Sequence, residues 1–283
     1  MESIRASAIF SGKEVAGPSA KNRSTTLIFG TYKKYRTAIK SYEGVPTAPE
    51  LLMAQEGAIS VYYAPFEWVN PEARVVLVGI TPGKTQAANA LTEARRAIEQ
   101  NLADEEVLKR AKATGAFSGA MRPNLISMMD AVGLNTWLEL TSCSTLFGAD
   151  SKMMQTASVL QFPVFSSGEN YNGTPDMTKH TLLRTMLLEH FGAQCSRLPN
   201  AVFVPLGPVP TKAMAWLAAQ GIVSSNRILE GLPHPSGANA ERIKYFLGQK
   251  ERGALSKKTD PDKLDTARTQ LRIAVKALPR TSS

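Results

Sequence analysis

Apolar runs and helical repeats alternate through the middle of the chain. Two runs, 74–79 and 201–206, are apolar without alternation, as in parallel strands buried on both faces. Two further strands are expected at 137–147 and 227–232. Apolar residues at helical spacing, with glycine or proline near the ends, predict helices at 87–98, 123–133, 182–191, 211–220, 240–247 and 260–276.

This alternation predicts an α/β fold: one domain over 47–283 whose mostly parallel central sheet is flanked by helices. In such a sheet, ligands bind at the carboxyl ends of the strands. Residues 1–46 are rich in Ser, Gly, Lys and Arg, and we expect a basic arm that is loosely ordered until it meets phosphate. A solvated tail with no role is the alternative.

Charge and cysteine content narrow the classes of function. The chain has 33 Lys and Arg against 24 Asp and Glu, a net charge of +9, which favours an acidic partner such as nucleic acid. Its two cysteines, Cys143 and Cys195, exclude a disulfide framework and a four-cysteine zinc or iron–sulfur site. We therefore expect no metal. Because the chain also lacks an apolar stretch of about 18 residues, we expect a cytoplasmic protein.

Two unusual loops each follow a predicted strand, so they are expected to face each other at one edge of the sheet. Glycines at both ends of Gly79–Gly83 and a proline between them give a tight turn whose backbone can approach a planar ligand. In the second loop Pro235 constrains the chain that presents His234. A histidine beside a closed pocket can donate a hydrogen bond to charge developing on a leaving group.

With GITPG at 79–83 and HPSGAN at 234–239, the chain resembles the uracil-DNA glycosylase superfamily. FSGAMRPNL at 117–125 and VFVPLGPVPTKAM at 202–214 are similar to family segments, and the resemblance runs in order from about 62 to 248. It implies an enzyme of base excision repair that flips uracil out of DNA and hydrolyses its N-glycosidic bond, leaving an abasic site, without a cofactor. We expect it to act on uracil-containing DNA as a monomer.

The resemblance also assigns roles to residues. Phe117 would stack on the flipped base, a core side chain being the alternative, and His234 would donate to the uracil O2 as the bond breaks. The walls of the base pocket would come from Gly79, Ile80, Pro82 and Gly83. Contacts with DNA would come from Lys84, Ser236, Gly237, Asn239 and Arg242.

Three departures from the family pattern matter. Thr81 stands where many relatives have Asp or Asn; its hydroxyl can orient a water but is no carboxylate base, so slower turnover is expected. The family asparagine that reads the uracil edge would belong to the segment 138–145, which has none, so its substitute would be Ser142, Thr141, Ser144, Asn124 or Asn135.

The third departure is the small tip Gly237-Ala238-Asn239, so Arg242 or another loop must fill the emptied base stack. Because branches without the carboxylate generally carry an iron–sulfur cluster, this chain would be an outlying, cluster-free member. A P-loop is excluded, since only three residues separate Gly79 from Gly83 where that motif needs four. The stronger rival is a DNA-binding protein of the same fold that has lost catalysis.

Overall fold

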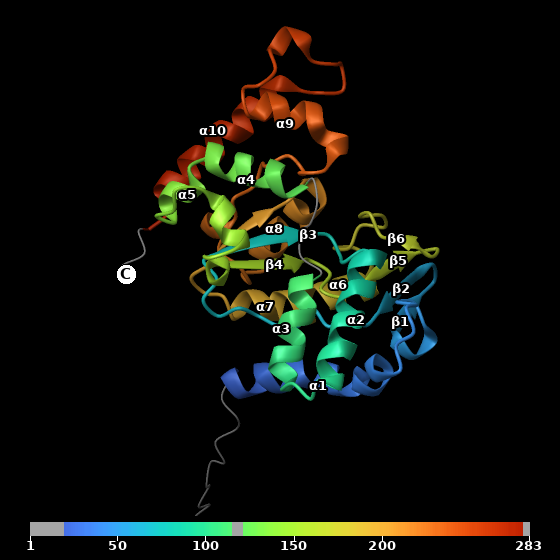
Figure 1. Ribbon diagram of the computed structural model, residues 1–283. Helices are drawn as coiled ribbons and strands as arrows, with labels where there is room; N and C mark the ends of the chain where they lie inside the picture. Colours follow the sequence, from blue (N-terminus) through green and yellow to red (C-terminus); the bar gives the residue numbers. More distant parts are fainter. Residues whose placement is uncertain (1–19, 115–120, 280–283) are drawn as a thin grey trace, which may run out of the picture.

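A three-stranded parallel sheet with helices on both faces forms the centre of the molecule (Figure 1). The computed structural model describes residues 20–114 and 121–279, with side chains from residue 30 onward. In the sheet, β3 (Val75–Gly79) lies between β4 (Met154–Ser158) and β7 (Val202–Pro205). An isolated parallel bridge from Phe203 to Ile228 extends the pairing beyond β7. The α/β prediction is confirmed at this level.

The continuous apolar run of β3 feeds two cores. Val76 and Val78 are buried against α1 (Ala20–Lys40), α2 (Lys84–Glu99) and α3 (Asp104–Thr114). Val75 and Leu77 are buried on the other face, which is covered by α4 (Met121–Ala131), α5 (Leu134–Trp137), α9 (Ala240–Phe246) and α10 (Pro261–Ala277). Figure 1 shows these two helix layers on opposite sides of β3. Burial on both faces explains why the strand does not alternate.

The first helix layer is completed by α8 (Pro208–Ala219) and by a continuous helical segment after residue 180. That segment consists of α6 (Thr181–Met186), a π-helical turn (Leu187–Gly192) and α7 (Ala193–Ser196). In the described ranges, no helix is long and apolar enough to cross a membrane.

A second sheet, which the sequence pattern did not predict, is antiparallel. It contains β1 (Leu52–Glu56), β2 (Ile59–Tyr62), β5 (Val164–Ser166) and β6 (Glu169–Asn170), in that order. The chain passes from β4 of the parallel sheet to β5 of this sheet through residues 159–163. The central sheet is therefore smaller than predicted, and only part of the β-structure is parallel.

The strand predicted at 137–147 is wrong. These residues follow α5 and form a 3₁₀ turn (Cys143–Phe147). The Asp130 carboxylate accepts hydrogen bonds from the Cys143 amide (2.8 Å) and the Ser142 hydroxyl (2.7 Å), and Glu139 has a positive φ of 61°. The Asp130 side chain thus takes up a backbone amide that would otherwise pair with a neighbouring strand. The strand beside β3 is β4.

The other three predicted strands differ in outcome. Strands at 75–79 and 202–205 confirm the two apolar runs. The strand predicted at 227–232 is reduced to the Ile228 bridge and one further backbone hydrogen bond, from the Leu229 amide to Phe203. The chain still lies beside β7 there, so the loop that follows starts at the predicted edge.

The prediction of a loosely ordered arm over 1–46 is wrong for the part that the structure describes. Residues 20–40 form α1, and Tyr32, Tyr35 and Ile39 are buried in the core. The Tyr35 ring stacks on Tyr63 with centroids 4.5 Å apart. The lysines Lys33 and Lys34 occupy the exposed face. An amphipathic helix therefore uses the basic residues as its solvated side.

Candidate functional site at the carboxyl edge of the parallel sheet

The two loops singled out in the sequence lie near each other at the carboxyl edge of the parallel sheet. Gly79 ends β3 and pairs in register with Ser158, the last residue of β4. His234 lies on the other side, against Gly207, which follows β7. A Cβ added to Gly207 would be 3.4 Å from the His234 Cβ, and its φ of +91° also favours glycine. The edge therefore runs from Ser158 past Gly79 to His234.

The imidazole of His234 has a defined proton arrangement. Its Nδ1 accepts a hydrogen bond from the Ser236 amide at 3.3 Å, so the ring proton lies on Nε2. Burial lowers the pKa of His234 below the ordinary 6.5, so the ring is neutral at pH 7. The site thus offers one neutral N–H donor with a fixed tautomer.

Side chains around the second loop hold it in place. Asn124 of α4 donates to the Pro235 carbonyl at 2.9 Å. Asn239 donates to the Ser236 hydroxyl at 3.3 Å, and its carbonyl accepts from Arg242 at 2.7 Å. The predicted DNA contacts Ser236, Asn239 and Arg242 are thus linked to one another. Gly237 at the tip is exposed, and a Cβ there would meet no atom within 4 Å.

Backbone hydrogen bonds join the first loop to the chain that leaves β4. The Gly79 carbonyl accepts from the Val159 amide at 3.0 Å, and the Ile80 carbonyl accepts from the Leu160 amide at 2.9 Å. These two carbonyls are therefore occupied.

The Thr81 hydroxyl continues this connection. It donates to the Phe162 carbonyl at 2.9 Å and accepts from the Val164 amide at 3.0 Å. A hydroxyl has one donor and two acceptor sites, so its only donor is committed to the backbone. This geometry favours a structural role for the Thr81 hydroxyl, which shapes the turn, over the orientation of a water.

The end of the first loop is also fixed. Pro82 is buried, and the Gly83 amide donates to Gln86 at 3.0 Å as α2 begins. The Lys84 amide donates to Asn170 at 2.9 Å, while the Lys84 residue itself is exposed. Its ammonium is available to a phosphate.

Ser142, one of the five candidates for reading the uracil edge, lies before a 3₁₀ turn, and the strand that pairs with the end of β3 is β4, which ends at Ser158. The Ser142 hydroxyl donates to Asp130 and accepts from the Ser144 amide. Asn135 donates to the carbonyl of Thr141 at 3.2 Å, so it too serves local structure. Phe117 lies outside the described residues. Ser158 was missed because the polar sequence of β4 carries no strand signal.

A cavity of about 30 Å³ next to Pro82 is lined by polar side chains that the sequence analysis did not single out. We call it the polar niche; its polar members are Lys112, Thr156, Ser158, Gln161 and Gln194. The signal for Lys112 was available, since it falls one turn after Leu108 on the buried face of α3. For Gln194 we see none.

The niche borders two buried titratable residues. Lys112 is 6% exposed and Glu67 is 2% exposed. Burial lowers the pKa of Lys112 to about 7 and raises the pKa of Glu67 to about 8, and the two groups partly offset these shifts. Such groups at the edge of a sheet where ligands bind are candidates for a functional role.

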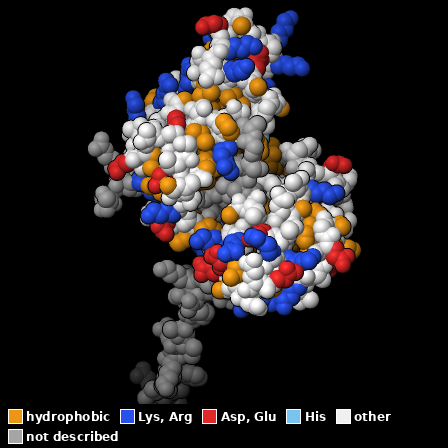
Figure 2. Space-filling model, viewed as in Figure 1, with side chains coloured by type: hydrophobic (Ala, Val, Ile, Leu, Met, Phe, Trp, Pro, Cys, Tyr) orange, Lys and Arg blue, Asp and Glu red, His pale blue; other side chains and the backbone are white. Residues whose placement is uncertain are grey.

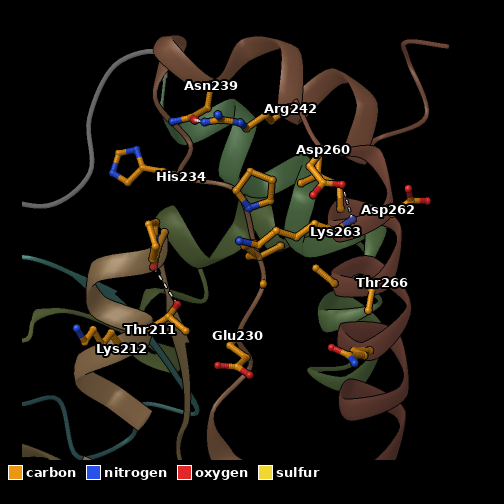
Figure 3. Close-up of a pocket in the computed structure, with 18 of the residues that line it drawn as sticks. Thr211, Lys212, Glu230, His234, Asn239, Arg242, Asp260, Asp262, Lys263 and Thr266 are labelled. Atoms are coloured by element: carbon orange, nitrogen blue, oxygen red, sulfur yellow. Dashed lines mark hydrogen bonds between the residues drawn. The ribbon is translucent and has the colours of Figure 1, made fainter. Parts of the chain in front are cut away.

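A cavity of about 1170 Å³ lies beyond His234 between α8 and α10. Figure 3 shows that Lys263 of α10 extends into it, whereas the His234 ring points away from its centre. Arg242 and Lys258 also line it, together with Glu230 and Asp260. His234 is itself among the residues that line this groove, so the groove adjoins the candidate site.

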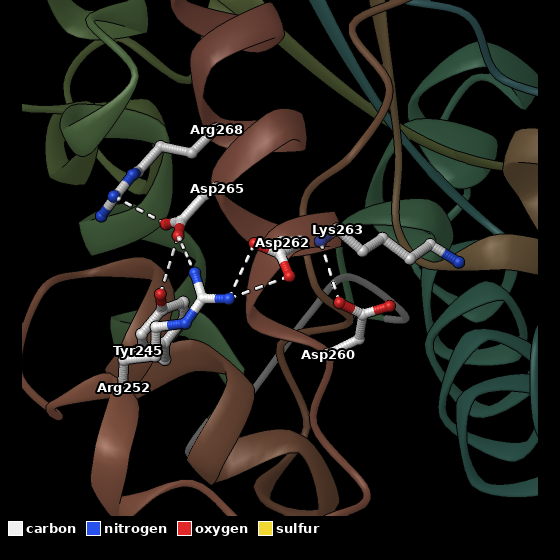
Figure 4. A network of polar contacts seen from close by, with 7 residues as sticks. All are labelled: Tyr245, Arg252, Asp260, Asp262, Lys263, Asp265 and Arg268. Carbon is white, nitrogen blue, oxygen red and sulfur yellow. Dashed lines mark hydrogen bonds and ion pairs between the residues drawn. The ribbon is translucent and has the colours of Figure 1, made fainter.

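A polar network holds the start of α10, where Lys263 lies (Figure 4). The Asp260 carboxylate caps the helix by accepting from the Lys263 amide at 3.1 Å. Arg252 pairs with Asp262 at 2.8 Å, and Asp265 accepts from Tyr245 at 2.7 Å. The network therefore fixes the start of the helix that carries Lys263.

Surface charge differs between the two ends of the molecule (Figure 2). Over α2 and α3, arginines are interleaved with carboxylates and form ion pairs such as Arg95–Glu99 and Arg110–Glu106. Near α9 and the segment after it, Lys and Arg predominate in the view. No group of three His, Cys, Asp or Glu that could hold a metal occurs within the described ranges.

Comparisons with known proteins give one relative. The chain is 36% identical over 200 residues to the uncharacterized protein YoxB of Bacillus subtilis (strain 168), a stretch that covers 70% of this chain and 78% of YoxB. No family model matches the sequence, and no solved structure matches it. At this identity and coverage, the chain belongs to the same family as YoxB.

Proposed function

We propose that this protein is a DNA glycosylase with a uracil-DNA glycosylase-like fold, which flips uracil out of DNA and hydrolyses its N-glycosidic bond. The observation that carries the proposal is the geometry of His234. Its Nδ1 accepts from Ser236, which leaves a neutral Nε2–H donor at the carboxyl edge of the sheet, on the same edge as the Gly79–Gly83 loop.

The sequence resemblance supports the same activity. The two motifs that carry it, at 79–83 and 234–239, are brought to one sheet edge although more than half of the chain separates them. Such loops at the ends of parallel strands form a binding crevice. The exposed Lys84 and the accessible tip at Gly237 would contact the phosphates that flank the flipped nucleotide.

In this mechanism the bond between the sugar C1′ and the base nitrogen breaks, and its electron pair leaves with uracil. His234 donates its Nε2–H to the oxygen on which the negative charge develops. Water adds to C1′ and releases a proton, which completes the hydrolysis. A neutral imidazole suits this role, because its N–H can donate a hydrogen bond to the leaving anion while the ring keeps its proton.

One observation favours the alternative of a DNA-binding protein with weak or no catalysis. The only hydroxyl donor of Thr81 is bonded to the Phe162 carbonyl, so Thr81 does not replace a carboxylate that activates water. Leaving-group stabilisation by His234 and the phosphates of the DNA would then carry the reaction. Turnover is expected to be slow.

The deciding experiment incubates the purified protein with a labelled uracil-containing oligonucleotide and then with alkali, which cuts the strand where a base was removed. His234→Ala should slow base removal by about 10²- to 10³-fold while leaving DNA affinity largely unchanged. His180→Ala is the control, because His180 lies near Glu56 of β1. Wild-type protein that binds DNA but leaves it uncut would establish the non-catalytic alternative.

A further inference from the structure

The polar niche has room for one small group. Its volume of about 30 Å³ accepts a water or a single oxygen atom and excludes a base ring. Pro82 of the first loop forms one wall, and Ser158 at the end of β4 forms another. A planar ligand held against the first loop can therefore insert only a substituent of its ring.

Lys112 presents a hydrogen-bond donor to this niche. Its Nζ donates to the Phe66 carbonyl at 3.2 Å and to the Trp68 carbonyl at 2.6 Å. An ammonium group has three N–H bonds, so one remains after these two contacts. Because an ammonium only donates, the remaining N–H attracts an acceptor and repels another donor.

Gln194 adds an unsatisfied donor. The residue is 4% exposed, lines the niche, and its Nε2 has no hydrogen-bond partner in the described part of the chain. A buried amide group without a partner costs free energy, so the position is suited to a ligand that supplies an acceptor.

We propose that the niche formed by Lys112 and Gln194 receives the exocyclic carbonyl oxygen of a deaminated base. The inference rests on the proposed glycosylase function and names its substrate class. Uracil and hypoxanthine carry a carbonyl where cytosine and adenine carry an amino group. The amino group would place its N–H bonds against the donor of Lys112, so the parent bases are rejected.

The arrangement of the sheet fits this assignment. Ser158 and His234 lie on opposite sides of Gly79, near the ends of β4 and β7. Because β3 lies between them, β4 and β7 are separated by two inter-strand distances, or about 10 Å. A base with a hydrogen bond at each end can bridge this span. His234 would hold one edge of the base while Lys112 and Gln194 read the opposite edge.

Protonation of Lys112 tunes the selectivity. When the amine loses a proton, its two remaining N–H bonds serve Phe66 and Trp68, and a lone pair replaces the third N–H. The titratable groups that act on Lys112 are Glu67 and Arg197, and burial lowers the pKa of Lys112 to about 7. Affinity for a carbonyl should therefore fall as the pH rises through neutrality.

The test measures binding of free uracil, hypoxanthine, cytosine and adenine by calorimetry at pH 6.5, where Lys112 is mostly protonated. Wild-type protein should bind the two carbonyl bases about ten- to a hundredfold more tightly than the amino bases. Lys112→Met and Gln194→Leu should each remove most of this preference. Lys109→Met, exposed on the same helix and with its ammonium over the Trp68 ring, is the matched control and should retain it.

Equal affinity for the two classes of base, or a preference that both niche variants retain, would overturn the inference. Circular dichroism checks that each variant keeps the wild-type fold. Gln194→Glu provides a second test, because it replaces the amide donor by an acceptor of the same size. If the carbonyl preference is found and the protein removes no uracil from DNA, the glycosylase proposal fails while the niche assignment stands.

Discussion

Thr81 shows how one hydroxyl can serve structure in a place where chemistry is expected. It joins the first loop to Phe162 and Val164, so its removal leaves a backbone acceptor and a donor without a partner. Thr81→Val, which keeps the shape, should lower the free energy of unfolding by about 1–3 kcal/mol in urea denaturation. Thr85→Val, on the exposed face of α2, is the control.

The same variant separates the two roles of Thr81. Reduced stability with a nearly normal rate of base removal is expected if the hydroxyl only shapes the turn. An unchanged stability with a rate lowered by tenfold or more would contradict this and assign the hydroxyl to the attacking water.

The pH dependence of the reaction should report the state of His234. Its pKa lies below 6.5, so the neutral Nε2–H form persists at neutral and alkaline pH. Protonation adds a proton to Nδ1, which then opposes the Ser236 amide and disrupts the loop. Single-turnover rates should therefore fall on acidification below pH 6.5.

This acid limb should be absent in His234→Gln, which has a donor but does not titrate. An acid limb of the same shape in that variant would show that another group controls the rate. The comparison is made in buffers of constant ionic strength, so that DNA affinity stays comparable.

At the scale of elements, α1 is part of the core. Ile39 is fully buried, so Ile39→Ala should lower the free energy of unfolding by about 2–5 kcal/mol, while Thr37→Ala on the exposed side should have little effect. Equal, small effects of both substitutions on thermal denaturation would show that α1 is loosely attached.

The elements that the sequence predicted correctly are those whose apolar pattern decides their burial. The run in β3 and the helical repeat in α2 each required only local information. The failures came from polar residues with distant partners. Gln155 of β4 is buried because it contacts Asn70 and Trp68, and the segment 138–145 is held by Asp130, and neither contact is visible in local spacing.

The candidate site shows the same division. The sequence indicated both loops and the shared edge, since the order of strands and motifs determines them. It gave no indication of the Thr81 contacts or of Gln194, because these depend on how the chain between β4 and β5 and the helix α7 fold back onto the loop.

For the whole molecule, the net charge of +9 predicts DNA binding that weakens steeply with salt. We expect the plot of log affinity against log salt concentration to have a slope steeper than about −3, as for release of counterions from several phosphates. Lys263→Gln, in the groove beyond His234, should make the slope shallower by about 1.

Arg252→Gln is the matched control, because Arg252 is already paired with Asp262. Its slope should stay close to the wild-type value. The same slope for both variants and the wild type would place the DNA away from this groove.

The hydrogen bond from the Val164 amide to Thr81 also allows opening of the junction between the two sheets to be measured. An amide hydrogen exchanges with solvent only when its hydrogen bond opens, and the Val164 amide is held by the Thr81 oxygen. Its exchange rate in deuterated water therefore reports how often the first loop separates from β5. A ligand that settles on the loop would slow that exchange, so arrival at the site can be followed from one backbone position without labelling the DNA or altering the protein.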